Sequence, residues 1–161
     1  METLNEWFKN HEALSSVFST LFIGMVALAI TWIYSAKSKK ISEDEIFYNL
    51  YSKFNERYDK INDILQELYI ANLANPITIE ELKNDIRLHS ACIDFFNICA
   101  EEHYWNRRKR IEKEVWDAWN YGMNNWYNKT EVLKLLWKEE IAGEKYKSYY
   151  LEKDDNLFQE L

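Results

Sequence analysis

Glycine and proline are scarce in this sequence. Only three glycines and one proline occur among 161 residues, and no two glycines lie near one another. Because these two residue types mark most turns, their scarcity favours a few long helices over many strands. It also argues against a glycine-rich phosphate loop, which needs several glycines close together. We therefore predict an all-α protein without a nucleotide-binding loop.

Recognisable catalytic motifs are missing as well. The sequence has no serine- or cysteine-centred nucleophile elbow and no HExxH zinc motif. Its formal net charge is −7, so nucleic acid is not the expected partner. These absences predict a protein that is not an enzyme and takes no cofactor.

The most distinctive stretch that is present is the uncharged run Ala13–Ala36. A helix of this length, rising about 1.5 Å per residue, is about 36 Å long and covers a hydrocarbon core of about 30 Å. A core helix of a soluble protein would carry a polar face, and this run has none. A cleaved signal peptide would begin with positive residues and have a shorter apolar core. The run is therefore predicted to be a transmembrane helix.

Lysines and aromatic residues flank this span. One lysine precedes it and three follow it directly, so the positive-inside rule places the N-terminus outside and the remaining chain in the cytoplasm. Aromatic rings are expected at the level of the lipid headgroups. The predicted membrane-interface residues are Trp7, Trp32, Tyr34, Lys37, Lys39 and Lys40.

One face of the span carries small residues. Ser16, Thr20 and Gly24 follow one another at four-residue intervals. Small residues at this spacing let two transmembrane helices approach closely. One expectation is self-association into a homo-oligomer through this face, and the alternative is that the face meets only lipid.

Four helices are predicted after the span, forming a cytoplasmic bundle. Ser42–Glu45 and Thr78–Glu81 are capping boxes that begin the first two helices. The first helix is expected to end at Asn75–Pro76 and the second near Trp105–Arg108. The third is predicted at Ile111–Tyr127, and the fourth is expected to start with Asn128 and Glu131 and to end at Gly143.

The first of these helices has a seven-residue apolar repeat that allows two interpretations. The repeat would suit a coiled-coil stalk or the core of a bundle. Arg57 at the companion seam position and a wide apolar stripe favour the bundle. The repeat consists of Phe47, Phe54, Ile61 and Leu68.

The predicted organisation has five parts. An aromatic turn at Tyr146–Leu151 is expected to pack on the bundle, and the residues after it are acidic. The parts are an extracytoplasmic tail 1–12, the transmembrane helix 13–36, a basic juxtamembrane linker 37–42, a helical domain 43–151 and an acidic frayed tail 152–161.

Four residues of the second predicted helix have metal-ligand chemistry, namely His89, Cys92, Cys99 and His103. They share one helix face. Cys92 and Cys99 would lie about 10 Å apart along the axis, too far for one zinc ion with Zn–S bonds of about 2.3 Å. No metal site is therefore predicted, and these side chains are expected to line the core.

Two charged stretches follow on the same helix and in its terminal turn. Glu101–His103 could supply an acid–base pair, but no nucleophile is near it in sequence, so a solvated surface is expected. The basic stretch that begins at Trp105 is expected to be a solvated turn, and the alternatives are contact with a partner, with anionic headgroups or with nucleic acid. This candidate consists of Trp105, Arg107, Arg108, Lys109 and Arg110.

The third predicted helix carries a tryptophan stripe. Trp116, Trp119 and Trp126 share a face with Val115 and Met123. Such a stripe is expected to belong to the core, and any exposed part of it would be the first candidate for a partner site.

Three segments, Phe95–Tyr104, Val115–Met123 and Leu136–Glu140, give the chain a resemblance to a family of uncharacterised bacterial proteins. That family pairs one N-terminal membrane span with a small Trp-rich helical cytoplasmic domain. The resemblance covers about Ile79–Leu151 and departs from the family at Trp105–Arg110, where the family has a shorter turn with glycine. It implies the inner membrane of a bacterium and a phage-related role, in defence or exclusion. It carries over no activity and no site residue.

The leading functional hypothesis is a membrane-anchored, non-catalytic module that binds another protein. The alternative is a membrane-perturbing effector that oligomerises through the small-residue face. The third hypothesis is a metal-dependent enzyme that uses His89 with Cys92, or Cys99 with His103.

Overall fold

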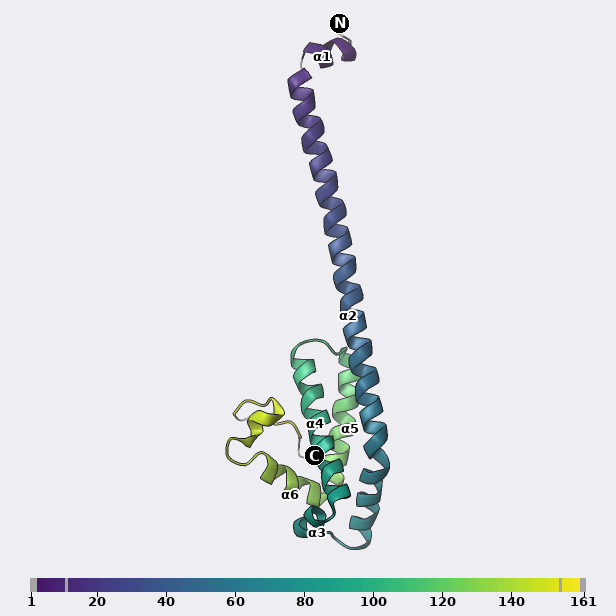
Figure 1. Cartoon of the computed structure of the whole chain (residues 1–161), viewed down its shortest axis with the longest axis vertical. Coiled ribbons are helices and arrows are strands. Elements are labelled where there is room, and N and C mark those ends of the chain that lie inside the picture. The colour runs from purple at the N-terminus through teal and green to yellow at the C-terminus, as the bar shows by residue number, and fades with distance from the viewer. Residues whose placement is uncertain (1–2, 11, 154, 160–161) are drawn as a thin grey trace. The chain divides into compact units, whose positions relative to one another are not determined.

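The computed structural model describes residues 3–10, 12–153 and 155–159. All regular structure among these residues is helical, as predicted, and Figure 1 shows the elements along the chain. The chain divides into two compact units, Met1–Glu45 and Ile46–Leu161.

The first unit contains the apolar helix. A short helix, α1 (Leu4–Asn10), precedes α2, which runs over Glu12–Ala74. One window of α2 is long and apolar enough to cross a membrane, and none of that window is buried. Hydroxyl groups within it donate to their own helix, from Thr20 to the Ser16 carbonyl at 3.0 Å and from Thr31 to the Ala27 carbonyl at 2.8 Å. These two hydroxyl groups therefore have hydrogen-bond partners within their own helix.

The predicted helix start at Ser42 is wrong. The helix α2 is continuous through residues 37–42, so the basic linker is helical and the Ser42–Glu45 capping box lies inside a helix. A capping box provides partners for backbone N–H groups only where a helix begins. Here no glycine or proline interrupts the chain, and the helix continues through this polar stretch. Its end at Ala74, before Asn75 and Pro76, is as predicted.

In the second unit, the C-terminal part of α2 packs with α4 (Ile86–Arg107) and α5 (Lys113–Lys129), which lie beside it in Figure 1. Arg57 of α2 pairs with Glu101 of α4 at 2.8 Å, and Tyr51 of α2 stacks on Trp119 of α5 with ring centroids 5.8 Å apart. The bundle interpretation of the seven-residue repeat is confirmed, because its central members are core residues. The buried apolar residues of α2 are Phe54, Ile61, Leu65 and Leu68.

The helix predicted from Thr78 to about Arg108 is two helices. The capping box at Thr78 and Glu81 is present and begins α3 (Ile79–Asn84), which places Leu82 in the core. Asp85 then takes an extended conformation and its carboxylate accepts from the Leu88 N–H at 3.0 Å, beginning α4. The prediction missed this break because Asp85 has no glycine or proline beside it.

Asp85→Ala should lower the free energy of unfolding by about 1 kcal/mol, because the variant removes the side-chain cap of α4. Urea unfolding of the detergent-solubilised protein, followed by tryptophan fluorescence, measures this loss. Asp94→Ala is the matched control, since Asp94 is an exposed residue within the same helix. An equal effect of the two substitutions would contradict the capping role.

The remaining elements complete the bundle. The helix α5 begins two residues later than predicted, since Ile111 is buried in the turn before it. Thr130 separates α5 from α6 (Glu131–Glu140), and Gly143 has a positive φ of 69° just after α6. A 3-10 helix, η1 (Lys145–Tyr149), then buries Tyr149, so the predicted aromatic packing at 146–151 is confirmed.

The prediction that residues 152–161 fray is wrong for the described part of that tail. Leu157 is 4% exposed and Phe158 is 7% exposed, and both belong to the hydrophobic core. The prediction of fraying was based on the acidic residues of the tail and did not take this apolar pair into account. Burial of a leucine and a phenylalanine is favourable enough to order a short segment that has no helix of its own.

Candidate functional site

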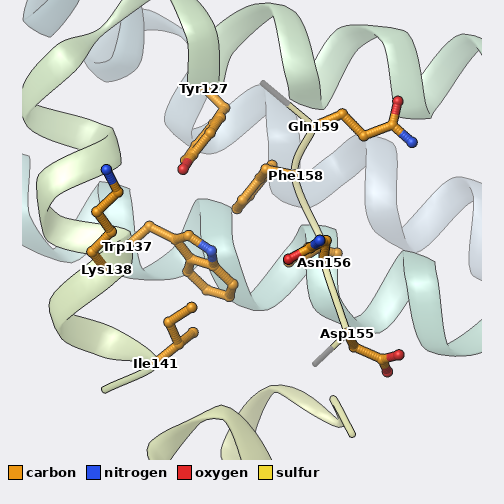
Figure 2. Close-up of a pocket in the computed structure, with 9 residues that line it drawn as sticks. Tyr127, Trp137, Lys138, Ile141, Asp155, Asn156, Phe158 and Gln159 are labelled. Carbon is orange, nitrogen blue, oxygen red and sulfur yellow. The ribbon is translucent and has the colours of Figure 1, made fainter. Parts of the chain in front are cut away.

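The C-terminal segment Asp155–Gln159 occupies a slot between three helices of the second unit. Phe158 inserts its ring among aromatic rings of α4, α5 and α6, which we call the Phe158 slot. The ring centroids of Phe158 and Tyr127 lie 4.4 Å apart with an interplanar angle of 6°, and Trp137 meets Phe158 edge-on at 5.1 Å. Figure 2 shows Phe158 directed between these two rings. The slot consists of Phe95, Phe96, Tyr127 and Trp137.

Two asparagine side chains of α5 bind the backbone of the segment. The Gln159 N–H donates to Asn124 Oδ1 at 2.6 Å, and Asn128 Nδ2 donates to the Gln159 carbonyl at 2.8 Å. Asn124 is 4% exposed, and its amide nitrogen donates to the Asn120 carbonyl at 2.7 Å. Its oxygen is thus committed to a backbone N–H. The segment is held through its main chain at the residue after Phe158.

A cavity of about 400 Å³ lies beside the segment. Trp137 and Ile141 form apolar parts of its wall, and Lys138 also lines it (Figure 2). The side chain of Gln159 points away from the ring of Phe158 in the same view. The cavity therefore borders the slot at Tyr127 and Trp137, and the segment itself forms its other wall.

Arg107 fastens the start of the segment. Its guanidinium lies 2.9 Å from Asp155 Oδ2 and donates to the Tyr150 carbonyl at 2.5 Å. Arg107 was one of the predicted partner or anion contacts, and the structure gives it a role within the chain. Arg108 lies over the Tyr104 ring at 5.3 Å, and Trp105 packs against the core.

The rest of the basic stretch forms the turn between α4 and α5. Lys109 is exposed and has a positive φ of 55°. The Arg110 N–H donates to the Trp105 carbonyl at 3.1 Å, which closes the turn. Contact of this turn with a partner or with headgroups stays a prediction.

A second site is buried between α2 and α4 around Glu102. The sequence predicts a solvated surface for Glu101–His103, and this is wrong for Glu102, which is 0% exposed. The Tyr58 hydroxyl donates to Glu102 Oε2 at 3.3 Å and lies 3.4 Å from Cys99 Sγ. Within the described part of the chain, Glu102 Oε1 has no hydrogen-bond partner. Its position next to the core face explains the burial, since Glu102 lies three residues after Cys99 on the helix.

Burial determines the ionisation of this group. Desolvation raises the pKa of Glu102 to about 8, although the Tyr58 hydrogen bond and the nearby Arg57 both lower it. Desolvation also raises the pKa of the Tyr58 hydroxyl well above its ordinary value. Glu102 is therefore a neutral acid below about pH 8, and a protonated carboxyl costs less to bury than a carboxylate.

The residues with metal-ligand chemistry are distributed along α4. Cys92 and Cys99 are both fully buried, as expected, whereas His89 and His103 are half-buried. The His103 ring lies 5.9 Å from the Trp116 ring. Among the described residues, no group of three or more His, Cys, Asp or Glu side chains is placed to hold a metal ion.

Cys92 should react with iodoacetamide at least about a thousandfold more slowly in the folded protein than in the urea-unfolded chain. Burial raises the pKa of its thiol to about 12, and the thiolate is the nucleophile. Mass spectrometry after timed alkylation at pH 8 measures both rates. Alkylation of the folded protein at the unfolded rate would show that this part of α4 is open to solvent.

The tryptophan stripe of α5 lies at the edge of the core. Trp116, Trp119 and Trp126 are half-buried and pack against the core cluster. Trp119 meets Phe54 edge-on at 5.7 Å, and Trp126 meets Tyr69 edge-on at 6.4 Å. The core interpretation of the stripe is confirmed, with part of each indole left in solvent.

The predicted membrane-interface and helix-association residues lie in the first unit. Trp7 is 44% exposed, Trp32 is 75% exposed and Tyr34 is 72% exposed. The three lysines Lys37, Lys39 and Lys40 are exposed on α2. A Cβ added at Gly24 would meet no atom within 4 Å, so the face with Ser16 and Thr20 has room for a neighbour. Interface contact and self-association stay predictions.

Sequence reasoning missed the Phe158 slot and the buried carboxyl. The signal for the first was the pair Leu157–Phe158, two large apolar residues inside an acidic tail. The signal for the second was the three-residue spacing from Cys99 to Glu102, which places both on one helix face.

Comparisons of the chain with protein-family models, with curated proteins and with solved structures give no match. The resemblance to bacterial single-span proteins therefore stays a prediction, and the function has to be inferred from the residues themselves.

Proposed function

We propose that the protein is a single-span membrane-anchored module whose helical domain binds another protein in the bacterial cytoplasm, without catalysing a reaction. The observation that carries this proposal is the exposed apolar window of α2, a helix that also supplies Phe54 and Leu68 to the bundle core. An apolar window without a protein neighbour is expected to be covered by lipid. One helix thus joins an anchor to a folded domain.

The exposure of aromatic side chains in the second unit supports a binding role. Exposed aromatic side chains include Tyr48 and Tyr121, at 69% and 72% exposure, and half-buried indoles follow α5. Tyrosine and tryptophan are enriched where proteins bind one another. The two cysteines and the buried carboxyl, Cys92, Cys99 and Glu102, lie inside the core, where a substrate does not reach them. These placements favour binding over catalysis.

Affinity purification of the tagged full chain from detergent extracts tests the binding role. A specific partner should co-purify with the full chain and be lost from a chain that ends after Ala74. The absence of any partner under crosslinking conditions would count against the proposal. Digestion of the helical domain by protease added outside intact cells would contradict the cytoplasmic orientation, and extraction of the protein by alkaline carbonate would contradict the span.

A further inference from the structure

We propose that the Phe158 slot is a receptor for a short extended segment of a partner protein, and that the chain's own Asp155–Gln159 occupies it as an internal mimic. The segment that fits has an acidic residue followed, two and three positions later, by leucine and an aromatic residue. This inference rests on the proposed function, because it assigns the partner site and the partner chemistry.

The main-chain contacts point to a peptide ligand. Asn124 and Asn128 read the N–H and the carbonyl of one residue, Gln159, whose own side chain points away from the Phe158 ring. Such contacts do not depend on the identity of that side chain, so another extended segment can make them. Together, the two asparagines bind the backbone N–H and the backbone carbonyl of a single residue in an extended segment.

The burial of Asn124 favours a peptide over an apolar ligand in the slot. Its oxygen accepts from the Gln159 N–H, and the side chain is 4% exposed. If the segment left and an apolar ligand took its place, this oxygen would stay desolvated without a donor, which is unfavourable. A second peptide segment restores the donor. The slot is therefore suited to exchange between segments.

Shape and charge define the ligand further. Phe158 supplies the aromatic side chain, and about 400 Å³ of cavity remains beside the segment, next to Trp137 and Ile141. A larger aromatic or an additional apolar side chain can enter this space. Arg107, 2.9 Å from Asp155, favours an acidic residue at the first position of the ligand.

A labelled peptide, Asp-Asn-Leu-Phe-Gln-Glu-Leu, the sequence of residues 155–161, tests the proposal on the detergent-solubilised full chain. Phe158→Ala weakens the binding of the chain's own segment in the slot. A larger fraction of the molecules then has an empty slot that can take the peptide. The peptide should bind this variant at least about tenfold more tightly than the wild type, because apparent affinity scales with the competent fraction. A peptide with alanine in place of its phenylalanine should not bind. Asn156→Ala, at an exposed position of the segment, is the control variant and should bind like the wild type.

A second substitution tests the hydrogen bond to the peptide backbone. Asn124→Leu, added to Phe158→Ala, removes the acceptor for the peptide N–H and should weaken peptide binding about tenfold. Equal peptide binding by Phe158→Ala and the wild type would overturn the proposal. Labelled wild-type chain that binds Phe158→Ala where the peptide does not would also overturn it, since the occupant would then be a second copy.

If Phe158→Ala does not fold, amide hydrogen exchange of the wild-type chain tests the proposal instead. The Gln159 amide should exchange at least about a hundredfold faster than the amides of Phe95–Cys99, because the segment is expected to open while the bundle stays folded. Exchange at the same rate as α4 would show that the segment opens only on global unfolding, which overturns the proposal. A partner that co-purifies equally with the wild type and with Asn124→Leu would leave the proposed function standing while placing its site elsewhere.

Discussion

The free energy of unfolding should fall by about 3 kcal/mol between pH 5 and pH 8 through Glu102 alone. Burial raises the pKa of this carboxyl from 4.5 to about 8. Between these two values the folded protein keeps a proton that the unfolded chain releases, so stability decreases as pH rises. The contribution is fully present below the unfolded pKa and is lost as pH rises through the folded one.

The groups around Glu102 do not offset desolvation, so the pKa of this carboxyl stays raised. From α2, the Tyr58 hydroxyl and Arg57 face it, and from α4, Cys99 and Glu101 do. Arg57 is already paired with Glu101 at 2.8 Å, so its charge does not stabilise the Glu102 carboxylate enough to offset desolvation. The unpartnered Oε1 leaves the ionised form with an unsatisfied buried oxygen.

Urea unfolding at several pH values, followed by tryptophan fluorescence, measures the dependence. Glu102→Gln keeps the shape of the side chain but has no titrating proton, so its stability curve should lack this decline. Asp94→Asn, which removes an exposed carboxylate of the same helix, should retain it. Parallel pH curves for the wild type and Glu102→Gln would show that the carboxyl ionises in the same range in both states.

Phe158→Ala should lower the free energy of unfolding by about 3 to 5 kcal/mol, the usual cost of removing a buried aromatic ring. The ring is 7% exposed and contacts aromatic rings of three helices. Truncation leaves a cavity that rigid neighbouring rings fill only in part. The loss is therefore expected to exceed that of any single surface substitution.

The same urea assay at constant pH measures this loss. Asn156→Ala is the matched control, because it lies in the same segment with an exposed side chain, and its effect should stay within about 0.5 kcal/mol. A loss of less than about 1 kcal/mol for Phe158→Ala would mean that the segment contributes little to the folded state. That result would also weaken the assignment of the slot as a tight binding site.

The helical class and most helix ends could be predicted because they depend on local chemistry. The end of α2 at Asn75–Pro76 and the cap at Thr78 follow from residues next to the boundary. The predicted start at Ser42 shows the limit of this reasoning. A capping motif states that a helix can begin at a residue, and only the preceding residues decide whether one has already begun.

The two sites could not be predicted from local patterns, because each depends on contacts between distant residues. Tyr58 and Glu102 are separated by 44 positions, and Asn124 and Gln159 by 35. Helical periodicity placed Glu102 near the core face, but only the packing of α2 against α4 removes water from it. In the tail, composition suggested fraying, whereas two residues and their packing partners decide the outcome.

The late position of Phe158 in the sequence has a consequence for biosynthesis. The apolar window of α2 is made more than a hundred residues earlier, so on the proposed function the anchor reaches the bilayer while the bundle still lacks its central ring. Nascent chains would then display Tyr127 and Trp137 to solvent until the ribosome has released residue 158. Chains arrested before that residue would keep this aromatic surface open, and chaperones and proteases recognise such surfaces.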